Sequence, residues 1–276
     1  MVIPTRTLND GHEIPAIGFG TYKLTGDDGV GSVLSALEAG YRLIDTALNY
    51  ENEVQVGEAI RRSGIPRHEI TVATKLPGRF HGEHETRTGF EESLSNLGVD
   101  FVDLFLIHWP LPRVDKFVDS WRAMIMLRDA GFIRSIGVSN FTQSHLSRII
   151  EETGVVPAVN QIELHPHFGQ AAMRAFHAEH GIQTQSWSPL AQSRSLIDNA
   201  VVTAVADAHG VTPSQAVLAW HVQLGSVPIP KSATLARQRE NLDIFGFELT
   251  DAEVDSLSSL DSGRLWGGDP ETNEEF

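Results

Sequence analysis

Four side chains that could together carry out acid–base chemistry stand at or near the ends of short apolar stretches. Asp45 and Lys75 each end such a stretch, and His108 directly follows a third. Tyr50 stands five residues beyond Asp45. Ionisable residues at the carboxyl ends of successive parallel strands are what the catalytic face of a (β/α)8 barrel requires. The spacing therefore predicts a single site built from these four residues.

The chemistry suggested by this group is proton donation to a carbonyl oxygen. A free tyrosine has a pKa of about 10, and an ammonium group about 4 Å away contributes roughly 4 kcal/mol at an effective dielectric of about 20. We therefore expect Lys75 to lower the pKa of Tyr50 towards neutrality. Asp45 should keep the buried Lys75 charged, and His108 should orient the carbonyl as a neutral donor. Each residue alone has an ordinary structural explanation, so the prediction depends on all four together.

Strand and helix patterns alternate along the chain and would bring these residues to one face. Strands are expected at 17–20, 42–45, 70–75, 102–107, 133–138, 158–162, 182–186 and 226–229. Helices are expected at 30–39, 52–63, 86–97, 117–130, 144–152, 170–179, 200–209, 213–224, 234–244 and 250–259. This order predicts an α/β fold with one domain over residues 1–276, a (β/α)8 TIM barrel with an extra C-terminal helix and a tail.

Local signals support these boundaries. Asn9-Asp10-Gly11 between two short alternating runs predicts an N-terminal β-hairpin over residues 5–15. Thr212-Pro213 is typical of a helix start, and Thr250 with Glu253 forms a capping-box pattern. A doubly wound dinucleotide-binding fold is disfavoured, because Gly18-Phe19-Gly20 has only the opening of its glycine fingerprint.

Composition limits the classes of partner. The 276 residues are 41% hydrophobic, contain no cysteine and carry a formal net charge of −15. That charge would repel nucleic acid and anionic membranes, and no apolar stretch approaches the roughly 20 residues of a membrane-spanning helix. The N-terminus has no secretory-signal pattern. We expect a cytoplasmic monomer that acts on a small molecule, without nucleic-acid or membrane partners.

Two histidine-containing segments raise the possibility of a metal site. They are His81-Gly82-Glu83-His84-Glu85 and His165-Pro166-His167. Neither has the H-E-x-x-H spacing that places two ligands on one helical face. We therefore expect these histidines to lie on the surface and to bind no metal.

Several motifs along the chain resemble those of the aldo-keto reductases, from about Leu8 to about Leu260. They are residues 40–47 with Tyr50, Asn52 and Glu53, then 74–76, 102–104, 108–110, 136–141, 159–161 and 229–232. Residues 186–190, with Trp187 where most relatives have tyrosine, are most similar to bacterial members that reduce 2,5-diketo-D-gluconate. The resemblance implies NADPH-dependent reduction of aldehydes, ketones or dicarbonyls by a tetrad of Asp45, Tyr50, Lys75 and His108, with Tyr50 as proton donor.

The resemblance also implies how NADPH is bound. Trp187 would stack on the nicotinamide, and Lys231, Ser232 and Arg237 would hold the 2′-phosphate. The implied cofactor-binding set is Gly20, Thr21, Ser139, Asn140, Gln161, Trp187, Ser188, Leu190, Gln192, Lys231, Ser232, Ala233, Thr234, Arg237, Glu240 and Asn241. Two basic groups facing a dianion favour NADPH over NADH, although some relatives have arginine in place of Thr234. The structural alternative is that 234–244 is a solvated amphipathic helix with no role in binding.

The substrate pocket is less marked in the sequence. His108, Tyr22, Trp109 and Trp266 are its expected residues. The tail over residues 263–276 could fold over this pocket or could be disordered, given its Gly, Pro and Glu content. Two other functions remain open: a cofactor-binding sensor on the same fold, and a metal-dependent barrel hydrolase.

Overall fold

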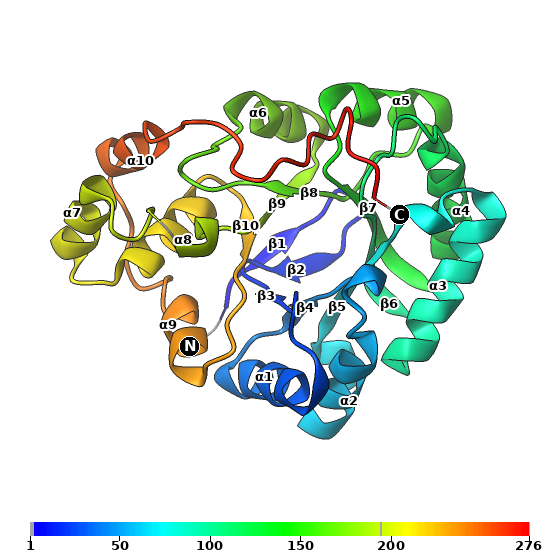
Figure 1. Ribbon diagram of the computed structural model, residues 1–276, viewed down its shortest axis with the longest axis horizontal. Helices are drawn as coiled ribbons and strands as arrows, with labels where there is room; N and C mark the ends of the chain where they lie inside the picture. Colours follow the sequence, from blue (N-terminus) through cyan, green and yellow to red (C-terminus); the bar gives the residue numbers. More distant parts are fainter. Residues whose placement is uncertain (1–2, 194, 276) are drawn as a thin grey trace.

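The computed structural model describes residues 3–193 and 195–275. Its centre is a barrel of parallel strands surrounded by helices (Figure 1). The strands are β3 (Phe19–Gly20), β4 (Leu43–Asp45), β5 (Thr71–Leu76), β6 (Val102–Ile107), β7 (Ile133–Ser139), β8 (Val159–Glu163), β9 (Gln183–Trp187) and β10 (Val227–Ile229). Neighbours in sequence are neighbours in the sheet. The amide groups of Gly18 and Gly20 donate to the carbonyls of Pro228 and Pro230, each at 3.0 Å, and so close the barrel. The predicted fold is confirmed.

The helices follow the predicted order. They are α1 (Gly26–Ala39), α2 (Glu53–Ser63), α3 (Glu83–Leu97), α4 (Phe117–Asp129), α5 (Gln143–Thr153), α6 (Ala171–His180), α7 (Ala200–His209), α8 (Pro213–Gln223), α9 (Leu235–Leu242) and α10 (Asp251–Ser258). Helices α1 and α3 begin several residues before the predicted starts. Their first turns are polar and acidic, which suits a helix N-terminus but carries no apolar periodicity. None of the helices in the described parts is long and apolar enough to cross a membrane.

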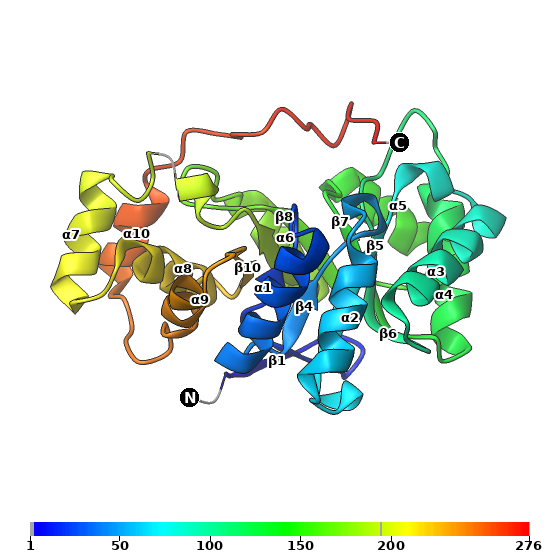
Figure 2. The ribbon, with the colours of Figure 1, turned by 60° about the horizontal axis from the view of Figure 1, so that its bottom comes forward.

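The predicted N-terminal hairpin covers the end of the barrel opposite the site (Figure 2). Strand β1 (Thr5–Thr7) pairs antiparallel with β2 (Glu13–Pro15). The buried side chains of Leu8 and Ile14 pack with barrel residues such as Leu104. These contacts close the amino-terminal end of the barrel interior, so the carboxyl ends of the strands form the accessible face.

Hydrogen-bonded caps position the helices that follow β9. Thr212 Oγ1 accepts from Gln215 N at 3.3 Å at the start of α8, and Thr250 Oγ1 accepts from Glu253 N at 3.3 Å at the start of α10. Both predicted caps are confirmed. Replacing such a capping residue by alanine costs typically about 1 kcal/mol. Beyond α10 the chain crosses the carboxyl ends of the strands (Figures 1 and 2). Of the two alternatives for the tail, folding over the pocket is the one found.

Candidate active site

A cavity of about 840 Å³ opens at the carboxyl ends of the barrel strands. Most of the predicted site residues line it: Gly20, Thr21, Tyr22, Asp45, Tyr50, His108, Trp109, Ser139, Asn140, Gln161, Trp187, Ser188, Leu190, Gln192, Lys231 and Trp266. Lys75 lies directly behind this wall, bonded to Asp45. The remaining predicted residues lie outside the lining: Ser232, Ala233, Thr234, Arg237, Glu240 and Asn241.

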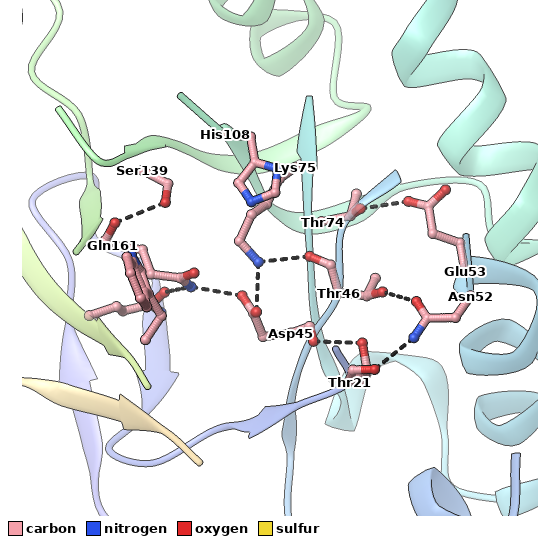
Figure 3. Close-up of polar contacts among 12 residues, drawn as sticks. Thr21, Asp45, Thr46, Asn52, Glu53, Thr74, Lys75, His108, Ser139 and Gln161 are labelled. Carbon is pink, nitrogen blue, oxygen red and sulfur yellow. Dashed lines mark hydrogen bonds and ion pairs between the residues drawn. The ribbon is translucent and has the colours of Figure 1, made fainter. Parts of the chain in front are cut away.

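A buried ion pair forms the base of the catalytic end (Figure 3). Lys75 Nζ lies 2.6 Å from Asp45 Oδ1 and donates to the carbonyl of Thr46 at 2.8 Å. Gln161 Nε2 donates to the other oxygen, Asp45 Oδ2, at 2.8 Å. Lys75 is fully buried. A buried pair is stable only when further hydrogen bonds satisfy its remaining atoms, and Thr46 and Gln161 provide these bonds.

A second group of polar contacts fixes the strand end that carries Asp45. Thr21 Oγ1 donates to the carbonyl of Asp45 at 3.0 Å, and Asn52 Nδ2 donates to the carbonyl of Thr21 at 2.7 Å. Asn52 Oδ1 accepts from Thr46 Oγ1 at 2.8 Å. Asn52 is fully buried and joins β3, β4 and the start of α2. Its role was not assigned from the sequence, where it was only part of a motif.

Tyr50 ends a short 3-10 helix, η1 (Leu48–Tyr50), and its ring faces the cavity. The ring centroid lies 5.1 Å from that of Tyr22, 5.8 Å from that of His108 and 5.2 Å from Lys75 Nζ. Burial, together with the negative charges of Asp45 and Glu275, raises the pKa of Tyr50 well above 10. The prediction that Lys75 brings this pKa near neutrality is therefore wrong. Asp45 already balances the ammonium charge, and desolvation of the phenolate dominates.

His108 contacts a carboxylate that sequence reasoning missed. Glu275, in the tail, lines the cavity and places Oε1 3.1 Å from His108 Nδ1. Burial by itself would raise the pKa of Glu275, but His108 and a hydrogen bond from Asn49 outweigh it and lower the pKa. No motif marks this residue in the sequence, because its position depends on the path of the tail across the barrel.

The tail that delivers Glu275 is attached along its length. Leu265 N donates to Glu163 Oε1 at 2.8 Å, and the Trp266 ring lies 5.6 Å from that of Trp187. Glu163 is a fully buried carboxylate at the end of β8, and its other oxygen lies 3.7 Å from Arg264 Nη1. A buried acid therefore fixes the start of the tail.

The residues predicted to contact the nicotinamide lie on one part of the cavity wall, where hydrogen bonds join them. Trp187 Nε1 donates to Asn140 Oδ1 at 2.8 Å, and Asn140 Nδ2 donates to the carbonyl of His108 at 3.0 Å. Gln161 differs from the expectation, because its amide nitrogen already donates to Asp45 and Gln185. Only its amide oxygen remains for a ligand.

The predicted phosphate-binding residues lie at the start of α9 and just before it. Lys231 and Arg237 are exposed, and neither forms an ion pair with any residue that the structure describes. Ser232 Oγ accepts from Thr234 N at 3.2 Å, which shapes the turn. On the later part of α9, Glu240 Oε1 accepts from Thr212 Oγ1 at 2.7 Å. Two unpaired cations beside an indole-lined cavity fit an NADP cofactor chemically.

The expectation of surface histidines is wrong for two of the four. His81 and His165 are buried, whereas His84 is exposed. His165 Nε2 lies 3.1 Å from Glu163 Oε1, and burial lowers the pKa of His81 to about 4. Within the described residues no group of three or more such side chains could hold a metal ion.

Comparisons with known proteins agree with this geometry. A model of the aldo/keto reductase family matches residues 16–262. The chain is 58% identical over 274 residues to 2,5-diketo-D-gluconic acid reductase B of Corynebacterium sp., covering 99% of each protein. It also resembles an aldo/keto reductase structure from Brucella melitensis, at 46% identity and a TM-score of 0.91 over 94% of this chain and 100% of that one. A Bombyx mori aldo-keto reductase in complex with NADP has 33% identity and a TM-score of 0.89 over 95% and 94%. The chain therefore belongs to the aldo/keto reductase family.

Proposed function

We propose that the protein reduces aldehydes, ketones or dicarbonyls to alcohols with NADPH, and that Tyr50 donates the proton. Membership of the family makes it an NADP-dependent oxidoreductase that acts on carbonyl groups. The observation that carries the residue assignment is the buried Asp45–Lys75 pair directly beside Tyr50 and His108 on the cavity wall. The name of the Corynebacterium relative, 2,5-diketo-D-gluconic acid reductase B, supports dicarbonyls such as diketo-gluconate as substrates. We propose 2-oxoaldehydes as a second class of substrate.

When bound, NADPH supplies the hydride that converts the carbonyl carbon to that of an alcohol. The carbonyl oxygen then gains negative charge and needs a proton from a nearby donor. Burial raises the pKa of Tyr50, which favours the protonated form that a proton donor requires. After the transfer, the Lys75 ammonium group, 5.2 Å from the centre of the Tyr50 ring, would stabilise the tyrosinate. The His108 ring, whose centre lies 5.8 Å from that of Tyr50, would orient the oxygen.

The remaining wall would hold the cofactor. Trp187 offers an aromatic face whose position is fixed by Asn140, and Leu190 and Gln192 continue the wall. Lys231 and Arg237 would bind the 2′-phosphate as charge-assisted donors. We further propose that the active unit is a monomer. We also propose a cytoplasmic location, because NADPH is available there. Light scattering would measure the molar mass in solution and so test whether the protein is a monomer.

The test is a substrate panel with NADPH and with NADH, run beside Tyr50→Phe. We expect turnover with NADPH and a loss of about 10²- to 10⁴-fold in kcat for the variant, the usual size of a general-acid contribution. Tyr41→Phe is the matched control, because the Tyr41 hydroxyl bonds the carbonyl of Gln238 at 3.3 Å away from the cavity. Unchanged activity in Tyr50→Phe would refute the proton donor. Tight NADPH binding without turnover of any carbonyl would support the sensor alternative instead.

A further inference from the structure

A buried carboxylate at the end of β8, that of Glu163, lies outside the cavity lining and contacts the segment of the tail that carries Trp266. We propose that Glu163 is a positioning residue: it holds Trp266 in place as a wall of the carbonyl pocket, and so favours carbonyl substrates long enough to reach that wall. The proposal rests on the proposed function, because it names which carbonyls the same site prefers.

Three groups meet the carboxylate of Glu163. Its Oε1 accepts a hydrogen bond from Leu265 N at 2.8 Å and lies 3.1 Å from His165 Nε2. Its Oε2 lies 3.7 Å from Arg264 Nη1. A carboxylate taken out of water is costly unless donors and opposite charges meet it, and the tail supplies two of these three groups. Glu163 therefore joins the barrel to the first residues of the tail.

The contact with Glu163 determines where Trp266 lies. Trp266 directly follows Leu265 and lines the cavity. The centre of its ring lies 5.6 Å from that of His165 and 5.6 Å from that of Trp187, in an edge-to-face arrangement with each. Such aromatic pairs depend on geometry. Trp266 therefore packs on two rings of the barrel only while Glu163 holds the backbone of Leu265.

Arg264 extends this anchor along the next turn of the tail. Its Nη1 donates to the carbonyl of Gly268 at 2.9 Å, and its guanidinium lies 5.0 Å from the centre of the Phe168 ring. Gly268 packs so closely on Trp109 that an added Cβ atom would lie 2.7 Å from its ring. Figure 2 shows the tail crossing above the barrel. The residues that Glu163 anchors thus reach a second ring of the cavity wall.

The place of Trp266 explains why substrate length should matter. Tyr50 and His108 follow β4 and β6, whereas Trp266 packs on Trp187 at the end of β9, which lies across the barrel in the strand order. We expect a three-carbon substrate such as methylglyoxal to contact mainly Tyr50 and His108. A six-carbon chain such as 2,5-diketo-D-gluconate extends further, towards Trp266.

The first variant is Glu163→Gln, which keeps the shape of the side chain. Whichever way the amide is turned, its NH2 group faces another donor, either Leu265 N or Arg264 Nη1. A buried donor without an acceptor is costly, so the contact with the tail should be lost. We expect the KM for 2,5-diketo-D-gluconate to rise about tenfold, with kcat and the KM for methylglyoxal changed by less than about twofold.

Arg264→Met tests the same contact from the tail, beyond the last helix, where the barrel does not depend on it for folding. We expect it to raise the KM for 2,5-diketo-D-gluconate by about threefold. The double variant Glu163→Gln/Arg264→Met should show no larger rise than Glu163→Gln, because both changes remove one contact. Glu271→Gln is the matched control, since Glu271 accepts from Thr142 Oγ1 at 2.8 Å at the start of α5. Its KM values should stay within about twofold of those of the original protein.

A second measurement follows Trp266 without substrate. Two tryptophan rings in contact couple their absorption, and circular dichroism records the coupling; Trp266→Phe identifies this signal. The signal should disappear in Glu163→Gln and persist in Glu271→Gln. The Kd for NADPH should change by less than about twofold in Glu163→Gln, because Trp187 keeps its hydrogen bond to Asn140 at 2.8 Å.

Three outcomes would overturn the proposal: an unchanged KM for 2,5-diketo-D-gluconate in folded Glu163→Gln, an equal rise for methylglyoxal, or an equal rise in Glu271→Gln. Thermal melting checks that each variant is folded. If Glu163→Gln does not fold, the same criteria apply to Arg264→Met. If the original protein reduces neither carbonyl, the proposed function fails, and the tryptophan signal alone decides whether Glu163 positions Trp266.

Discussion

The two ends of the cavity handle charge in opposite ways. At the catalytic end, Lys75 and Asp45 are buried and bonded to each other, to Thr46 and to Gln161. At the end proposed to bind the 2′-phosphate, which we call the phosphate end, Lys231 lines the cavity and Arg237 lies outside the lining. Both are exposed and have no ion-pair partner among the described residues. The charges of Lys75 and Asp45 balance each other without a ligand. The charges of Lys231 and Arg237 are balanced only when a ligand supplies negative charge.

We therefore expect the buried pair to position the reacting groups and the exposed cations to bind the cofactor. A preorganised group needs no rearrangement at the moment of reaction, because its dipoles and charges already point at the developing charge. Exposed cations keep their hydration and side-chain freedom until an anion binds, so they contribute to affinity and little to folding. Changes at the catalytic end should therefore affect stability and turnover together, whereas changes at the phosphate end should affect cofactor binding alone.

The largest expected effect is at the catalytic end. Lys75→Met leaves Asp45 buried without its counter-charge, so we expect the free energy of unfolding to fall by about 3–5 kcal/mol. Turnover should also be lost, because no ammonium group then stabilises the tyrosinate. Urea unfolding and steady-state kinetics measure the two losses. The double variant Asp45→Asn/Lys75→Met should recover most of the stability and none of the activity. An equally unstable double variant would show that packing, and not the ion pair, holds this end.

Acid should weaken the buried contact between α8 and the segment at the end of β9. His221 is fully buried, with Nε2 3.1 Å from the carbonyl of Pro189 and Nδ1 3.1 Å from Ser186 Oγ. Burial lowers the pKa of His221 to about 3. The unfolded chain, with a histidine pKa of about 6.5, binds the extra proton first, so stability falls as pH drops from about 6.5 towards 3.

At pH 5 this histidine should cost about 2 kcal/mol relative to pH 7. Urea unfolding of the original protein and of His221→Gln at both pH values isolates the contribution. The variant should be less stable at pH 7 and lose less on acidification. An identical acid loss in both proteins would assign the effect to other groups.

A smaller effect is expected at the phosphate end. Arg237→Met should raise the Kd for NADPH by about tenfold, equivalent to about 1.4 kcal/mol, because one charge-assisted contact is removed. The Kd for NADH and the free energy of unfolding should not change. Arg239→Met is the matched control on the same exposed helix. Equal losses for NADPH and NADH would place Arg237 away from the 2′-phosphate.

The smallest effect is that of salt. Exposed charges are screened as the Debye length falls from about 10 Å at 0.1 M to about 3 Å at 1 M. Across that range, NADPH affinity should weaken by about threefold more than NADH affinity. Urea unfolding at the same salt concentrations should show no comparable loss from the buried Asp45–Lys75 pair. Salt-independent NADPH binding would contradict the exposed character of this end.

The sequence was sufficient to predict the barrel and the side chains at its strand ends. Each strand carries a local apolar pattern, and the position of Asp45 or Lys75 at its end follows from that pattern and from the parallel topology. The barrel predictions succeeded because they needed only local periodicity and one rule about barrel topology. Trp187 and Lys231, which also line the cavity, were assigned from the family resemblance.

The features that were missed depend on contacts between distant segments. Glu275 reaches His108 because the tail crosses the barrel, and no local sequence pattern within residues 263–275 predicts that path. His165 is buried because Glu163 and Trp266 meet it from two segments. The pKa of Tyr50 was predicted in the wrong direction because desolvation is set by the whole surrounding wall.

The tail has one further consequence, for how this protein could diversify. It adds no strand to the barrel, and its contacts with the barrel are made mainly by side chains and loop backbone. We therefore expect substitutions in the tail to leave the barrel sheet in place while they change the wall that it adds to the cavity.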